Sequence, residues 1–128
     1  MKHVKHLITI GFMALGAPAI ADSFETIKVN AGEALFTAEC RRCHAPNATD
    51  PSYGPLLEGI VGRKAGAVEG YAYSEALGNA GFVWTTGALK AWIEDNDHFL
   101  PGTKMRHVGI EDPTVQDFIL TYLESISG

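Results

Sequence analysis

The apolar residues near the C-terminus follow the period of an α-helix. Asp112 is a suitable N-cap, and Pro113 suits the first helical position, where no backbone N–H is needed. Apolar residues then recur with spacings of 3, 1, 3, 1 and 3, which places them on one helical face. These residues are Val115, Phe118, Ile119, Tyr122, Leu123 and Ile126. The pattern predicts a helix with one buried face.

Capping signals predict three further helices. Asn30 and Glu33 have the spacing of a capping box, so we expect a helix to begin there and to run through residues 35–36. Thr85 precedes a second periodic apolar segment and can cap it. Ser74 can begin a short helical turn that ends at Gly78. The elements that the sequence predicts are therefore all helical.

Two segments, 46–66 and 97–109, are rich in Gly, Pro and Asp and are predicted to be loops. Loops of this length are unusual inside a domain as short as this one. They would be explained by a group around which they wrap, such as a flat apolar macrocycle.

The N-terminus has the pattern of a secretory signal peptide. A basic head precedes an apolar run over residues 7–17, and Ala19-Ile20-Ala21 offers a small-x-small cleavage site. A retained membrane anchor is the alternative, but residues 7–21 are only 15 in number and contain Pro18, whereas a spanning helix needs about 20 apolar residues. We expect a signal peptide over residues 1–21 that is cleaved, leaving residues 22–128 as one domain that is not membrane-embedded.

The charge of the chain argues against nucleic acid as a partner. The full sequence has a formal net charge of −5, and loss of Lys2 and Lys5 with the leader would change it to −7. Nucleic-acid phosphates require a basic face instead.

Cys40, Cys43 and His44 lie within five residues, and four kinds of site could use them. An exported protein could close a disulfide. A redox dithiol would want a βαβ context, and zinc would find at most three ligands here, with only His98 and His107 beyond them after cleavage. Only covalent haem accounts for a histidine directly after the second cysteine with no further ligand pair in the chain. The two sulfurs would bond the haem vinyl groups, and His44 would be the proximal iron ligand.

Met105 is the candidate for the opposite iron ligand. Of the three methionines, Met1 and Met13 lie in the predicted leader. An isolated Met is often a core gap filler, but Met105 has Lys104, Arg106 and His107 as neighbours rather than apolar residues. Ligation is therefore the favoured reading, with His98 and His107 as competitors.

The motifs "GEALFTAECRRCH", "YGPLLEGIVGRKAG", "GYAYSEA", "GFVWTTGALKAWI", "LPGTKM" and "FILTYLESI" together resemble those of class I c-type cytochromes, the mitochondrial and bacterial periplasmic electron carriers. The resemblance covers residues 30–126. It implies an all-α fold in which the N- and C-terminal helices cross around a covalently bound haem. Four residues match that crossing: Gly32, Phe36, Ile119 and Tyr122.

The resemblance also implies roles for individual residues. The carbonyl of Pro55 would accept a hydrogen bond from the second ring N–H of His44. Tyr73, Trp84, Arg63 and Thr103 match positions that bind or neutralise the haem propionates, which need partners when they are buried.

Several positions depart from the family pattern. Trp92 stands where a tyrosine hydroxyl usually approaches the methionine sulfur, so that hydrogen bond is either missing or made by the indole N–H. Leu77 replaces a polar position, and His107 replaces an aromatic residue beside the haem edge. Where mitochondrial members have lysines, this chain has Glu39, Asp97 and His98, with Lys104, Arg106, Arg41 and Arg42 as the nearby cations.

The predicted function is that of a soluble periplasmic one-electron carrier, not an enzyme, because protein ligands on both faces of the iron would leave no open position. Its partners would be redox proteins: a quinol-oxidising cytochrome complex or periplasmic dehydrogenase as donor, and an oxidase or photosynthetic reaction centre as acceptor. We expect a monomer. The alternative is a haem c enzyme of peroxidase type, or a gas sensor, in which the sixth ligand is displaced.

Overall fold

The structure, a computed structural model, describes residues 19–128. Within this range the chain forms five helices and no named strand: α1 (Ala19–Glu39), α2 (Glu75–Gly78), α3 (Thr86–Glu94), α4 (Asn96–Phe99) and α5 (Pro113–Ser125). One isolated antiparallel bridge joins Lys64 and Val83. The all-α prediction is confirmed. The predicted signal peptide, residues 1–21, lies outside the described residues except for its last three positions.

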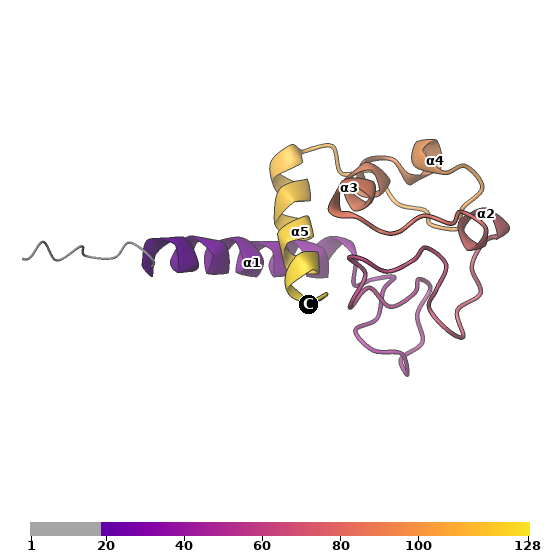
Figure 1. Cartoon of the computed structure of the whole chain (residues 1–128), viewed down its shortest axis with the longest axis horizontal. Coiled ribbons are helices and arrows are strands. Elements are labelled where there is room, and N and C mark those ends of the chain that lie inside the picture. Colours follow the sequence, from indigo (N-terminus) through magenta and orange to yellow (C-terminus); the bar gives the residue numbers. More distant parts are fainter. Residues whose placement is uncertain (1–18) are drawn as a thin grey trace, which may run out of the picture.

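The two long helices, α1 and α5, cross (Figure 1). A Cβ at Gly32 would collide with the Phe118 carbonyl and lie 2.9 Å from the Tyr122 Cβ, so only glycine permits this approach. Beside it the Phe36 ring packs on Tyr122 with centroids 5.2 Å apart. Phe36 and Ile119 are fully buried. The crossing therefore involves the four residues predicted for it.

Three predicted helix starts are confirmed by their caps. The Ser74 side chain accepts a hydrogen bond from the Leu77 backbone N–H, and Thr85 accepts one from Ala88. Asp112 accepts hydrogen bonds at the start of α5, where Pro113 takes the first position. These caps are read correctly because they depend on residues adjacent in sequence.

Two boundaries were wrong. Asn30 does not start a helix, because α1 begins at Ala19 and contains it. The eight residues before Asn30 include no Gly or Pro to stop the helix, so the capping-box spacing there has no structural effect. The segment 97–109 is also not wholly a loop. Asp95 caps α4 by accepting from the His98 backbone N–H at 2.9 Å.

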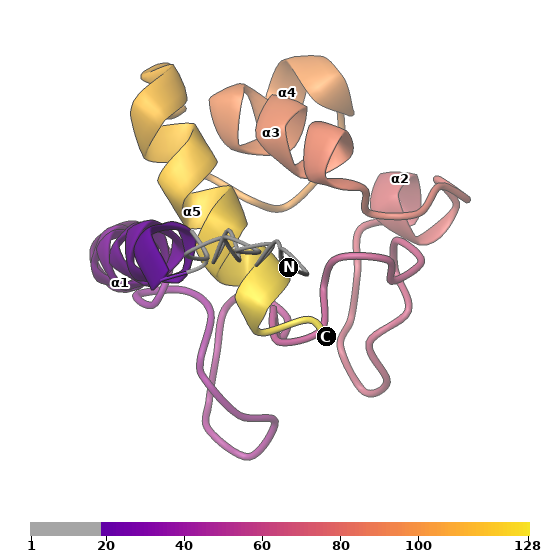
Figure 2. The same ribbon diagram turned by 60° about the vertical axis from the view of Figure 1, so that its left-hand side comes forward.

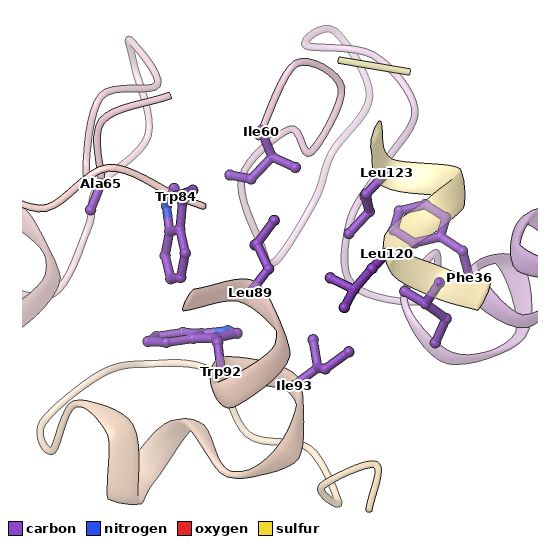
Figure 3. Packing of buried hydrophobic residues seen from close by; sticks show 10 residues of the cluster. Phe36, Ile60, Ala65, Trp84, Leu89, Trp92, Ile93, Leu120 and Leu123 are labelled. Atoms are coloured by element: carbon purple, nitrogen blue, oxygen red, sulfur yellow. The ribbon is translucent and has the colours of Figure 1, made fainter. Parts of the chain in front are cut away.

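The core extends from the helix crossing to a pair of tryptophans (Figure 3). Trp84 precedes α3 and Trp92 lies within it, and their rings meet edge to face with centroids 5.1 Å apart. Leu89 and Ile60 are buried with them. In two views the loops between α1 and α2 lie on one side of the molecule, and α3 and α4 lie on the other (Figures 1 and 2). Among residues 19–128 no helix has the length and apolar character needed to cross a bilayer.

Candidate functional site

A cavity of about 360 Å³ lies between these loops and α3. Its size is within the range of cofactor sites, and much of its lining is apolar. The walls come from the end of α1, the loop of residues 53–60, α3, the segment 103–110 and α5. Nine of the ten predicted site residues line it: Cys40, Cys43, His44, Pro55, Tyr73, Trp84, Trp92, Thr103 and Met105. The fold thus gathers residues that are up to 65 positions apart in the chain.

The two cysteines lie in a turn that follows α1. The backbone N–H groups of Cys43 and His44 both donate to the Cys40 carbonyl, at 3.1 and 3.0 Å. Both thiols are free, with Cys40 half-buried and Cys43 exposed. Burial, followed by the charge of Glu39, raises the pKa of the Cys40 thiol to about 12. The turn presents both sulfurs to the cavity as separate thiols rather than as a disulfide.

The imidazole of His44 is held with one nitrogen free. Its Nδ1 lies 2.7 Å from the Pro55 carbonyl oxygen. Because a carbonyl can only accept, Nδ1 carries the proton and Nε2 keeps its lone pair. Burial lowers the pKa of His44 and keeps the ring neutral. A Cβ at Gly54 would lie 2.6 Å from Nδ1, so glycine is needed beside the ring. His44 is therefore prepared to act as a metal ligand.

The sulfur of Met105 has a hydrogen-bond donor. The Trp92 indole Nε1–H donates to the Met105 Sδ at 3.0 Å. The sequence left open whether this bond is missing or made by the indole, and the structure shows the indole bond. Unlike the tyrosine hydroxyl that usually stands here, the indole N–H can only donate a hydrogen bond and has no hydroxyl proton to lose.

Three further predicted residues surround the same cavity. The Tyr73 hydroxyl accepts from the Val68 N–H at 3.3 Å, which leaves its own proton available to donate. Trp84 is only 6% exposed, and its indole N–H makes no hydrogen bond to any other residue of the described range. Thr103 is 3% exposed. A ligand that offers carboxylate oxygens would satisfy such donors.

Arg63 does not line the cavity. Its guanidinium donates to two backbone carbonyls, that of Leu56 at 2.6 Å and that of Glu58 at 3.0 Å. Burial lowers its pKa. Its role toward a propionate stays a prediction. Arg41 is also engaged elsewhere, because it pairs with Glu58 and covers the Phe36 ring.

Two residues that depart from the family pattern, Leu77 and His107, also line the cavity. The Nε2 atom of His107 is buried without a hydrogen-bond partner among the described residues. His98 is exposed and lies outside the lining.

Sequence reasoning missed three polar residues near Met105. The Tyr53 hydroxyl donates to the Lys104 carbonyl at 2.6 Å, and the Tyr71 hydroxyl donates to the Tyr53 carbonyl at 2.9 Å. The buried Asn96 amide donates to the Met105 carbonyl at 3.2 Å. No local pattern marks these residues, because the carbonyls that they contact lie 51, 18 and 9 positions away in the chain.

The sequence profile of the family described as "Cytochrome c" matches residues 29–127. This chain belongs to the cytochrome c family. It is 41% identical over 95 residues to cytochrome c2 of Rhodopila globiformis, an alignment covering 74% of this chain and 90% of that relative. It is 41% identical over 96 residues to cytochrome c-550 of Nitrobacter winogradskyi, covering 74% and 87%. The structure of cytochrome cH from Methylobacterium extorquens matches with a TM-score of 0.69 at 43% identity, covering 76% of this chain and 97% of that one.

The family settles the cofactor and the broad function. Cytochromes c bind haem c covalently, and Cys40, Cys43 and His44 form the Cys-x-x-Cys-His attachment motif. The cavity fits this group, because two free thiols, a neutral imidazole and a thioether line one largely apolar space. The protein is a class I c-type cytochrome and an electron carrier with redox protein partners.

Proposed function

We propose that this cytochrome is a periplasmic one-electron shuttle in which His44 and Met105 are the axial ligands of the haem iron. One observation supports this most strongly. The free Nε2 of His44 and the sulfur of Met105 belong to side chains that line the same cavity, and each is oriented by its own hydrogen bond. With both positions filled by the protein, no site is left for oxygen, peroxide or another substrate.

The protein residues suit electron transfer without chemistry on a substrate. Haem supplies the one-electron couple of its iron. His44 and Met105 are both neutral donors, so neither offsets the extra positive charge of ferric iron, and a comparatively high potential follows. The Pro55 carbonyl contacts the His44 ring and the Trp92 indole contacts the Met105 sulfur, so both proposed ligands have a fixed partner in the protein. Buried apolar residues such as Leu89 and Ile93 exclude water. A site that moves little on reduction exchanges electrons at low reorganisation cost.

The periplasmic location depends on the predicted signal peptide over residues 1–21. Its removal would leave a monomeric carrier of residues 22–128, with a formal charge of −7. The exposed charges at the cavity rim are mixed, since Glu39 lies near Arg42, and Arg106 pairs with Asp97 at 3.3 Å. The rim is therefore not a uniformly basic face, and because the net charge of the chain is negative, we expect donor and acceptor complexes with basic docking sites rather than the acidic sites that suit a lysine ring. Proposed donors are a quinol-oxidising complex or a periplasmic dehydrogenase. Proposed acceptors are an oxidase or a photosynthetic reaction centre.

The absorption spectrum of the oxidised protein tests the ligation. We expect a weak far-red sulfur-to-iron band that is absent in Met105→Ala. The reduced wild type should bind CO slowly, and the alanine variant rapidly. A wild type without the band that binds CO rapidly would instead indicate the enzyme or sensor alternative.

The salt dependence of electron transfer tests the docking proposal. Rates with purified candidate partners should fall as salt screens opposite charges. A rate that rises with salt would mean that the partner carries the same sign of charge, and it would contradict a basic docking site.

A further inference from the structure

Asn96 is a buried polar residue next to the segment that carries Met105. It is the first residue of α4, and it is only 4% exposed. Its side-chain Nδ2 donates to the Thr103 Oγ1 at 3.1 Å and to the Met105 carbonyl oxygen at 3.2 Å. An amide nitrogen has two N–H donors, so both are used on this one segment.

The segment it contacts has no regular structure of its own. Residues 103–110 belong to no helix, so their backbone groups depend on other partners. Arg106 donates to the carbonyls of Thr103 and Met105 at 2.8 and 2.9 Å, and Tyr53 donates to the Lys104 carbonyl. Side chains therefore hold the backbone on both sides of the Met105 thioether.

Of these side chains, Asn96 is the buried one. The Arg106 side chain is 65% exposed and Tyr53 is 60% exposed, so water can replace their bonds at little cost. Water does not reach the amide of Asn96 in the same way. Loss of the Asn96 amide would leave the buried Thr103 hydroxyl without its hydrogen-bond donor, and an unsatisfied polar group in a buried position is costly to stability.

We propose that Asn96 is a positioning residue for Met105, and that its two hydrogen bonds keep the thioether in place against competing ligands. This inference rests on the proposed function, since it assumes that Met105 binds the iron. Asn96 does not touch the iron. It acts from the start of α4, through the Thr103 hydroxyl and the Met105 backbone carbonyl.

The test uses haem-loaded protein at neutral pH and measures the affinity of the ferric form for added imidazole, which must displace Met105. Asn96→Leu removes both donors without adding charge. Asn96→Asp keeps the shape but replaces the amide with a group that only accepts. Asn79→Asp makes the same chemical change at an exposed asparagine and is the matched control.

Both Asn96 variants should bind imidazole about tenfold more tightly or better, and Asn79→Asp should match the wild type. The far-red band of the Asn96 variants should be weakened in the absence of added ligand. Should Asn96→Leu yield no haem-loaded protein, Asn96→Asp decides the question alone.

A structural role alone would lower the thermal midpoint of the Asn96 variants but leave imidazole affinity and the band unchanged, and that result overturns the proposal. A different result overturns the proposed function. If the wild type itself lacks a band that depends on Met105, ligation by Met105 is wrong, and the role of Asn96 falls with it. Comparing the spectra of the wild type and Met105→Ala, without any Asn96 variant, separates the two failures.

Discussion

Replacing Trp92 with phenylalanine should lower the reduction potential. The substitution removes the indole N–H that donates to the Met105 sulfur at 3.0 Å. The positive end of that N–H dipole points at the proposed sulfur ligand of the iron and would disfavour the additional positive charge of the ferric state. Without it, ferric iron is relatively more stable, and the potential falls.

The size of the shift follows from the strength of one hydrogen bond. Trp92 is 7% exposed, so water does not replace the lost donor easily. A neutral hydrogen bond contributes about 0.5–1.5 kcal/mol. For a one-electron couple this corresponds to about 20–65 mV, since a tenfold change in equilibrium is about 59 mV. Thioether sulfur is a weak acceptor, which favours the lower part of the range.

The assay is equilibrium redox titration of the purified protein, and Trp92→Tyr is the control. Phenylalanine and tyrosine lose similar packing against Trp84, but tyrosine brings a hydroxyl donor back toward the sulfur. We expect the potential of Trp92→Phe to lie below those of both the wild type and Trp92→Tyr. Equal potentials in the two variants would refute the reasoning, because packing alone would then account for any shift.

Three further substitutions test the fold and the site. Gly32→Ala should destabilise the protein by about 1–3 kcal/mol, because its Cβ collides with the backbone of α5, and thermal unfolding measures this as a loss of about 4–8 °C per kcal/mol. An unchanged midpoint would contradict the tight crossing. Gly54→Ala should displace the His44 ring from the Pro55 carbonyl and weaken the far-red band. An unaltered spectrum would show that the ring can accommodate the added methyl group without moving. Tyr53→Phe loses an exposed bond to the Lys104 carbonyl, so stability should fall by less than about 1 kcal/mol, and a larger fall in denaturant titration would mean that this contact is more than a surface bond.

Much of the site could be predicted because its signals are local or follow by elimination. The attachment motif lies within one turn of backbone, and its hydrogen bonds to the Cys40 carbonyl connect immediate neighbours. Met105 was singled out because the predicted leader holds the other methionines. The caps at Ser74, Thr85 and Asp112 were equally readable. The false cap at Asn30 shows the limit of such signals, since a capping spacing does not start a helix when nothing ends the preceding one.

The sequence by itself therefore determined the covalent attachment of the haem, the candidate ligands and most helix starts, because each depends on residues close together in the chain. Only the tertiary structure decided which groups contact the segment of the candidate ligand Met105: the Trp92 indole at its sulfur, the Asn96 amide at its carbonyl and the Tyr53 hydroxyl at the Lys104 carbonyl. The last of these joins residues 51 apart. Such contacts depend on how loops pack around a common cavity, and no periodicity or spacing in the chain encodes which side chains will meet there.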